Sequence, residues 1–227
     1  MPDRLTLSPL PEDPRGLVVM LHGGAERGTQ AVDDRSLAPR RTGWMLRAIS
    51  PELGAAGIGV GMLRFTVKGW NAPRATPATG PQASPAALPS PVRDARSALD
   101  ELHAEHPDVP IVLLGHSMGA RTAAWVADQP GVVGVVGLAP WFPHDDPVEA
   151  LAGKHLVAAH GHRDRITSAK ATRRYLQRAA AVAAEARFVD MGGLGHYMLT
   201  GVRRWNATAA TETIGLLDRV AGITSPK

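Results

Sequence analysis

The sequence predicts an α/β fold in which one mostly parallel, twisted sheet carries helices on both faces. Short apolar runs of strand length alternate with segments of helical periodicity, which is the pattern of β-α-β units. Residues 115–119 (Gly-His-Ser-Met-Gly) directly follow one of these runs, as a sharp turn from a strand into a helix requires. The chain has 227 residues without an internal repeat, so we expect a single domain over residues 1–227, with residues 1–15 as an N-terminal segment.

The individual elements follow in order from the spacing of apolar residues. Strands are predicted over residues 16–21, 58–65, 109–114, 132–138, 156–159 and 186–191. Helices are predicted over residues 44–56, 90–102, 120–127, 168–184 and 203–220. Pro51 should interrupt the first of these helices, because proline cannot donate the backbone hydrogen bond of a helix interior. Ser90 followed by Pro91 is typical of an N-cap and the first helical position.

Composition limits the possible function classes. Hydrophobic residues make up 44% of the chain, and no apolar run approaches the roughly 20 residues that a membrane helix needs. The N-terminus lacks a basic start followed by an apolar stretch, so we expect no signal peptide, a cytoplasmic location and no membrane partner. The net charge is +4, but the arginines are scattered, which argues against a nucleic-acid partner. With 0 cysteines, the chain has no disulfide, zinc-thiolate site or cysteine nucleophile.

Ser117 is the candidate nucleophile. Glycines lie two residues before and two residues after it, and a β-carbon at either position would meet the neighbouring strand or helix. The serine of such a turn takes a strained backbone conformation with a positive φ. This strain lifts the hydroxyl clear of the sheet, where a base can reach it. We therefore expect a nucleophile elbow at Ser117.

A second glycine-rich loop, His-Gly-Gly at residues 22–24, follows the first predicted strand. Glycines at this point allow backbone N–H groups to face a substrate oxygen. We expect the N–H groups of Gly24 and Met118 to form an oxyanion hole, with Ala25 beside it in the substrate site. For His22 we expect a structural hydrogen bond rather than a catalytic role.

Two later strands also end in loops with polar side chains. The strand over residues 156–159 leads to Asp164, and the strand over residues 186–191 leads into a glycine-rich loop that contains His196. A serine hydroxyl is a weak nucleophile at neutral pH and needs a histidine base, which a carboxylate orients. His196 is the candidate base, because it alone among the 9 histidines follows a late strand within a glycine-rich loop.

The order Ser117, Asp164 and His196, each just past the end of a strand, resembles the α/β-hydrolase family over about residues 16–220. The resemblance implies that family's fold with a minimal cap, a Ser-His-Asp triad and no metal or organic cofactor. It also implies that Asp164 is the acid, because the acid usually follows the penultimate strand. In some members the acid follows the strand before, where Asp145 and Asp146 lie in this chain. These two residues remain the alternative.

Two histidine-containing patterns have other interpretations. Residues 160–164 match the His-x-His-x-Asp pattern of binuclear metallohydrolases, but that pattern normally continues with a histidine where this chain has Arg165. We therefore expect no metal at this position. His116 occupies the variable position of the elbow, and we expect it to point away from the partners of the nucleophile.

The resemblance also suggests where substrate binds. Trp70 and Trp141 follow strand ends at places where α/β-hydrolases line the pocket, so both are candidate substrate-binding residues. The proline-rich segment over residues 72–91 either walls the pocket or is an ordered surface loop. Apart from this segment and residues 139–153, no connection is long enough for a large lid. We therefore expect an open, shallow pocket.

These features together predict a small, lidless serine hydrolase that cleaves carboxylic esters of small molecules through an acyl-enzyme. A thioesterase or an acyltransferase would use the same three residues, and the sequence does not separate these activities. A non-catalytic relative that serves as a ligand-binding protein is the alternative of another class. Such relatives usually lack a member of the triad, whereas this chain contains all three.

Overall fold

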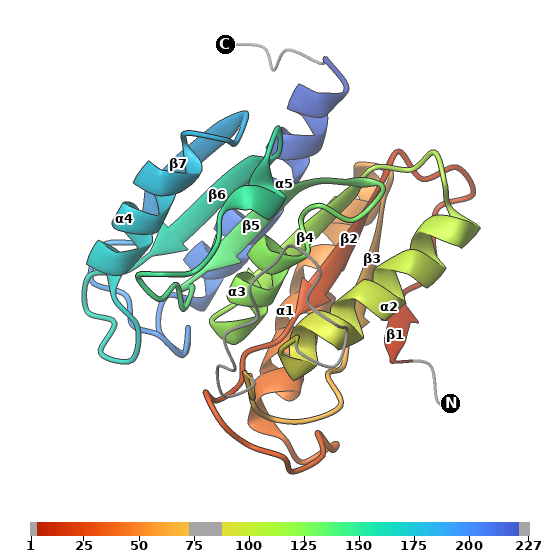
Figure 1. The fold of residues 1–227 in the computed structure, drawn as a ribbon. Coiled ribbons are helices and arrows are strands. Elements are labelled where there is room, and N and C mark those ends of the chain that lie inside the picture. The colour runs from red at the N-terminus through yellow and green to blue at the C-terminus, as the bar shows by residue number, and fades with distance from the viewer. Residues whose placement is uncertain (1–3, 73–87, 223–227) are drawn as a thin grey trace.

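The computed structural model describes residues 4–72 and 88–222, and its centre is a seven-stranded sheet (Figure 1). The strand order is β1-β3-β2-β4-β5-β6-β7. The strands are β1 (Leu5–Leu7), β2 (Gly16–Leu21), β3 (Ile58–Leu63), β4 (Ile111–His116), β5 (Val132–Leu138), β6 (His155–His160) and β7 (Glu185–Asp190). Every neighbouring pair is parallel except β1 and β3, which are antiparallel. The predicted mostly parallel sheet is confirmed.

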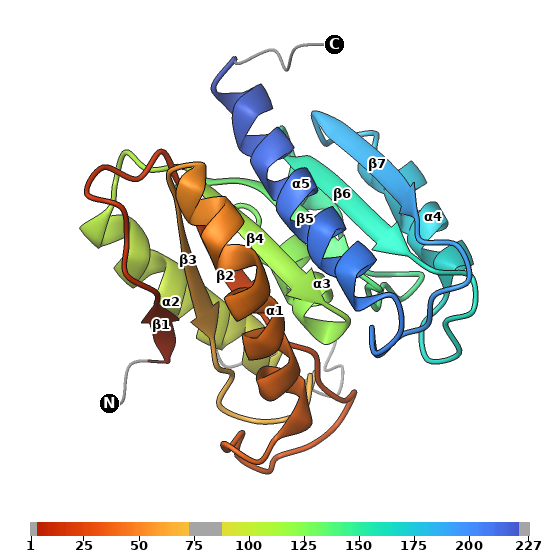
Figure 2. The same cartoon turned by 180° about the vertical axis from the view of Figure 1, so that it is seen from behind.

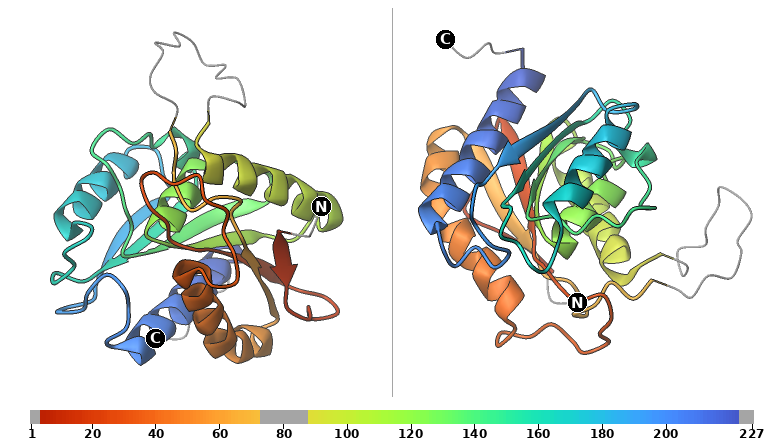
Figure 3. Two further views of the ribbon diagram at one scale, coloured as in Figure 1. Left: turned by 90° about the horizontal axis from the view of Figure 1, so that it is seen from below. Right: turned by 90° about the vertical axis from the view of Figure 1, so that its left-hand side faces the viewer.

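Helices cover both faces of the sheet, as predicted. The helices are α1 (Leu37–Ala55), α2 (Ser90–Glu105), α3 (Met118–Trp125), α4 (Ala169–Ala179) and α5 (Val202–Val220), together with the short 3-10 helix η2 (Glu149–Leu151). Helices α2, α3 and α4 lie in front of the sheet in Figure 1, and α1 and α5 lie behind it, as Figure 2 shows. Figure 3 shows the same three layers from below and from the side.

Strand β2 shows how the sequence builds two cores from one sheet. Because side chains alternate along a strand, Leu17, Val19 and Leu21 pack with α2 and α3 on one face. Val18 and Met20 pack with α1 and α5 on the other face. All six residues of β2 are buried, which is usual for a central parallel strand with helices on both sides.

Two elements differ most from the sequence-based prediction. Helix α1 begins at Leu37 rather than at residue 44 and continues through Pro51. The buried Ile49 and Leu53 flank this proline, and their packing against the sheet offsets the lost backbone hydrogen bond. Strand β1 was not predicted, because three residues are too few to show an alternating pattern.

The six parallel strands end on the same edge of the sheet, where the loops after β2, β3, β4, β5, β6 and β7 gather. Between β5 and β6 the chain contains only η2, which agrees with a minimal cap. Most of the proline-rich segment 72–91, namely residues 73–87, lies outside the described residues, so its predicted role as a pocket wall stays a prediction.

Candidate active site

Ser117 occupies the turn between β4 and α3 with φ 54° and ψ −115°. The predicted positive φ at a strand-to-helix junction is confirmed. A β-carbon at Gly115 would overlap the backbone of Ala120, and one at Gly119 would overlap the carbonyl of Leu21. The two glycines therefore permit the close contact between α3 and its neighbouring strands that this turn requires.

Two backbone N–H groups beside Ser117 are free to donate. Within residues 4–72 and 88–222, the N–H groups of Gly24 and Met118 have no hydrogen-bond acceptor. The loop that contains Gly23 and Gly24 packs against the nucleophile. A β-carbon added at Gly23 would lie only 3.5 Å from the β-carbon of Ser117. A β-carbon at Gly24 would overlap the side chain of Met118. The two predicted oxyanion donors are thus neighbours at the nucleophile.

His22 fixes the direction of one of these donors. The ring nitrogen Nε2 accepts a hydrogen bond from the backbone N–H of Phe65 at 3.1 Å, so Nδ1 carries the proton and donates to the carbonyl of Gly23 at 2.7 Å. In a trans peptide the carbonyl and the next N–H point in opposite directions. Because the Gly23 carbonyl faces His22, the N–H of Gly24 faces away from it. The expected structural role of His22 agrees with this geometry, and burial lowers the pKa of its ring to about 4.

The loop after Gly24 is held by the loop after β3. The N–H of Ala25 donates to the carbonyl of Lys68 at 2.9 Å, and the N–H of Trp70 donates to the carbonyl of Ala25 at 2.8 Å. The side-chain amide of Asn71 adds hydrogen bonds to the backbone of Gly28, both 2.9 Å long. These bonds leave the N–H of Ala25 unable to act as a third oxyanion donor.

Asp164 and His196 are brought together as predicted. The ring nitrogen Nδ1 of His196 lies 2.8 Å from Oδ2 of Asp164, and the side chain of Asp164 is only 1% exposed. The backbone N–H groups of Ile166 and Thr167 both donate to Oδ1 at 2.8 Å. Burial acts to raise the pKa of the Asp164 carboxyl, but hydrogen bonds from His160, His196 and these two N–H groups hold that pKa well below its usual range.

The sequence did not indicate two further contacts of this carboxylate. The fully buried His160 lies with Nε2 at 3.1 Å from Oδ2 of Asp164 and with Nδ1 at 2.8 Å from the hydroxyl of Thr172. The hydroxyl of Thr167 lies 2.9 Å from the same Oδ2 and 3.1 Å from Nδ1 of His196. A histidine at the end of a strand and a threonine three residues after the acid were the only sequence signals of these roles.

His116 does not point away from the partners of the nucleophile, and that prediction was wrong. Its Nε2 lies 3.0 Å from the backbone carbonyl of His196, and the two imidazole rings have centroids 5.0 Å apart. Burial lowers the pKa of His116 to about 3, so the ring is neutral and Nε2 donates to the carbonyl. The residue before the nucleophile is thereby connected to the loop that carries the base.

The alternative acids lie elsewhere. Asp146 forms a buried ion pair with Arg121, with distances of 2.6 Å and 2.5 Å, and within the described residues it has no bond to His196. Arg121 also packs between the rings of Trp70 and Trp141, at 4.0 Å and 4.4 Å from their centroids. The geometry therefore favours Asp164 over Asp145 and Asp146 as the partner of His196.

The two tryptophans differ in their position. Trp70 is 2% exposed and packs within the core, so protein contacts take up nearly all of its surface. Trp141 is half-buried, and its backbone N–H donates to the carbonyl of Ser117 at 3.2 Å. Of the two tryptophans, Trp141 has the more accessible side chain, and the substrate-binding role of both stays a prediction.

The hydroxyl of Ser117 has no hydrogen-bond partner among the described residues, and Ser117 and His196 are 6% and 7% exposed. In enzymes without substrate, the bond between nucleophile and base is often long and tightens only in the substrate complex. No group of three or more His, Asp or Glu side chains within residues 4–72 and 88–222 could hold a metal ion.

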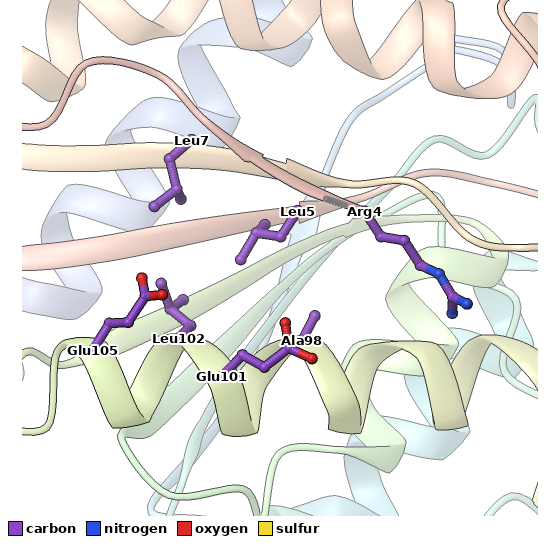
Figure 4. Close-up of a pocket in the computed structure, with 7 residues that line it drawn as sticks. All are labelled: Arg4, Leu5, Leu7, Ala98, Glu101, Leu102 and Glu105. Atoms are coloured by element: carbon purple, nitrogen blue, oxygen red, sulfur yellow. The ribbon is translucent and has the colours of Figure 1, made fainter. Parts of the chain in front are cut away.

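A cavity of about 390 Å³ adjoins the oxyanion loop. Its lining residues are His22, Gly23, Gly24, Ala25, Val32, Arg35, Ser36, Leu37, Ala38, Pro39 and Lys68. A cavity of about 280 Å³ between β1 and α2, shown in Figure 4, contains none of the predicted site residues. Its lining includes the acidic Glu101 and Glu105, whereas no acidic residue lines the cavity at the oxyanion loop.

Comparison with known proteins gives one partial family match and a set of similar folds. A family model described as serine aminopeptidase, S33, matches residues 77–159, which include Ser117 but neither Asp164 nor His196. Comparison with the curated proteins gives no match. None of the helices in the described part of the chain has the length and apolar character needed to cross a membrane.

Several solved structures are similar over almost the whole chain. An alpha-beta serine hydrolase homologue from Coxiella burnetii has a TM-score of 0.63 and 14% identity, over 92% of this chain and 90% of that chain. A serine hydrolase without lid from Xanthomonas campestris has a TM-score of 0.61 and 15% identity, over 98% and 90%. Esterase 2 from Thermogutta terrifontis has a TM-score of 0.63 and 17% identity, over 98% and 91%. At these identities the likeness shows the fold.

Proposed function

Because the chain has the α/β-hydrolase fold, we propose that it is a serine hydrolase that cleaves carboxylic esters through an acyl-enzyme. The observation that carries the proposal is the elbow at Ser117, with φ 54°, next to two unpaired N–H groups. The contact of 2.8 Å between His196 and Asp164 supplies the remaining parts of a triad. The esterases among the similar structures agree with this assignment.

In the proposed mechanism, His196 removes the proton of the Ser117 hydroxyl while its oxygen attacks the ester carbonyl. Asp164 holds the imidazole through Nδ1 and stabilises the imidazolium that forms. The N–H groups of Gly24 and Met118 donate to the oxyanion of the tetrahedral intermediate. His196 then protonates the leaving alcohol, and a water molecule activated by the same ring releases the acid.

Amide cleavage by an aminopeptidase would use the same residues, but the surroundings favour esters. An aminopeptidase must bind the positively charged α-amino group of its substrate, which calls for acidic residues near the scissile bond. The cavity beside the oxyanion loop is instead lined by Arg35 and Lys68 and by no acid.

Labelling with a fluorophosphonate probe tests the proposal directly, because only an activated serine reacts. We expect the wild-type protein to be labelled and Ser117→Ala to be unlabelled. Hydrolysis of p-nitrophenyl butyrate should fall by roughly 10⁴–10⁶ in Ser117→Ala, while the free energy of unfolding changes by no more than about 0.5 kcal/mol. Labelling that persists in Ser117→Ala would identify another nucleophile, and a wild-type protein that is neither labelled nor active would support a non-catalytic role.

A further inference from the structure

The cavity of about 390 Å³ adjoins the glycine loop that carries one of the proposed oxyanion donors. Gly23 and Gly24 belong to its lining. A β-carbon added at Gly23 would touch Ser117, and one added at Gly24 would overlap the side chain of Met118. A substrate whose carbonyl oxygen is held by the N–H of Gly24 would therefore have one side of the ester next to this cavity. The volume of the cavity falls within the range of ligand pockets, roughly 300–1,000 Å³.

The wall of the cavity combines apolar surface with two cations. Val32, Leu37 and Pro39 supply apolar contacts, and Leu37 is 76% exposed. Arg35 and Lys68 supply the charge, and neither forms an ion pair within the described residues. An exposed apolar side chain beside two unpaired cations is a surface that an amphiphilic ligand can cover.

The acids closest in sequence to Arg35 make their shortest contacts with other groups, although the charge of Asp33 also acts on Lys68. Asp34 pairs with Arg64 at 2.5 Å, and Asp33 accepts a hydrogen bond from the hydroxyl of Ser36 at 2.6 Å. Ser36 precedes α1 but makes no side-chain hydrogen bond to that helix, and the first turn of α1 contains no acidic residue. Within the described residues, no carboxylate of the protein lines the cavity that contains the two cations.

We propose that this cavity selects esters that carry a carboxylate a few methylene groups away from the scissile carbonyl. The methylene groups would pack against Leu37 and Pro39, and the carboxylate would bind the guanidinium of Arg35 and the ammonium of Lys68. The proposal rests on the proposed ester hydrolysis. It adds the substrate class, namely half-esters of dicarboxylic acids or esters of hydroxy acids.

Two pairs of matched esters test the proposal and distinguish the two sources of the carboxylate. Mono-p-nitrophenyl glutarate and p-nitrophenyl pentanoate differ only in the terminal carboxylate of the acyl part. 3-Carboxypropyl butyrate and butyl butyrate differ in the same way in the alcohol part. In at least one pair, the ratio of kcat/KM for the charged ester to that for the neutral ester should fall about tenfold in Lys68→Met and in Arg35→Gln.

The controls separate charge from folding. Lys68→Arg keeps the charge and should retain the wild-type ratio. Lys170→Met removes a charge from an exposed position on α4, outside the cavity, and should leave the ratio unchanged. Raising the ionic strength from 0.01 M to 1 M should lower the ratio in the wild type more than in Lys68→Met, because salt screens the interaction. Ratios that are equal in wild type, Lys68→Met and Arg35→Gln for both pairs would overturn the proposal.

A binding experiment keeps this test apart from the test of catalysis. Saturation-transfer NMR can compare mono-p-nitrophenyl glutarate with p-nitrophenyl pentanoate on Ser117→Ala, which cannot form an acyl-enzyme. We expect tighter binding of the glutarate, by about tenfold, and loss of the difference when Lys68→Met is added. If the wild type hydrolyses no ester but this difference is present, the proposed reaction fails and the anion site stands. If esters are hydrolysed and the charged ligand has no advantage in rate or binding, only the anion site fails.

Discussion

Asp164 receives hydrogen bonds from two histidines at the same oxygen, Oδ2. One is His196, at 2.8 Å, and the other is the fully buried His160, at 3.1 Å. The second bond restrains the carboxylate independently of the proposed base and helps to keep it ionised. His160 touches no reacting atom, so it is a positioning residue for Asp164.

We expect His160→Phe to raise the pKa of Asp164, because the carboxylate loses a hydrogen-bond donor worth about 1.5–3 kcal/mol. By the conversion of 1.36 kcal/mol per pKa unit, the increase should be about one to two units, measurable by carbon NMR of the labelled carboxylate. kcat should fall about tenfold to a hundredfold while KM changes little.

The matched control is His155→Phe on the same strand. His155 also contacts a carboxylate, that of Glu185 at 3.2 Å, but at the opposite end of β6. This variant should leave both the pKa of Asp164 and kcat at their wild-type values. An unchanged pKa of Asp164 in His160→Phe would show that the hydrogen bond of 3.1 Å between His160 and Asp164 does not lower this pKa.

At the scale of the elements, the oxyanion loop depends on contact between α3 and the loop after β2. We expect Gly24→Ala to lower kcat/KM by about 10²–10³, because its β-carbon would overlap Met118 and the carbonyl of Lys68 and would displace one oxyanion donor. Steady-state kinetics with p-nitrophenyl butyrate measures the loss. Gly54→Ala is the matched control, because a β-carbon at this position of α1 meets no atom within 4 Å. A Gly24→Ala enzyme with full activity would exclude this loop from catalysis.

Most elements could be predicted because their signal is local. Strand β5 was placed at its observed bounds, Val132–Leu138, since an unbroken apolar run indicates a buried parallel strand. Helix α1 begins seven residues before the predicted start at residue 44, and the early start was missed because its first two turns contain Pro39, two arginines and Gly43. Tertiary contacts help to hold those turns in a helix, for example the hydrogen bond from the Arg41 guanidinium to the carbonyl of Met198, and no local pattern reports such contacts.

The same distinction applies to the candidate site. Ser117, Asp164 and His196 could be found because each follows a strand within a recognisable loop. The contacts of His116 and Trp70 could not be found, because they depend on residues distant in the sequence. His116, for example, bonds to a carbonyl 80 residues away. A side chain's neighbours across the sheet edge are set by the fold, so the sequence pattern around each residue does not reveal them.

For the whole molecule, two buried neutral histidines predict how stability depends on pH. Burial lowers the pKa of His22 to about 4 and that of His116 to about 3, from the ordinary value of 6.5. As the pH falls below 6.5, the unfolded chain binds protons at both residues while the folded protein does not. Stability is therefore lost as the pH falls from 6.5 toward 4. Each of the two histidines should lower the free energy of unfolding by about 2 kcal/mol between pH 7 and pH 5.

Urea unfolding at pH 7 and pH 5 measures this effect. The depressed pKa of Asp164 acts only below the ordinary pKa of an aspartate, about 3.9, so it leaves the window between pH 7 and pH 5 unaffected. His162→Gln, a change at an exposed histidine, should keep the wild-type difference between the two pH values. Equal stability at pH 7 and pH 5 would show that His22 and His116 titrate normally in the folded protein.

The positive φ of Ser117 has a consequence for how this protein would respond to engineering. A non-glycine residue in that region of backbone space costs about 1–3 kcal/mol, and only glycine is free of the penalty. Ser117→Gly should accordingly unfold at a higher urea concentration than the wild type, by about 1 kcal/mol, and have no esterase activity. A library screened for heat resistance alone would then be enriched in clones without a nucleophile, so any stabilisation programme must screen for turnover in the same round.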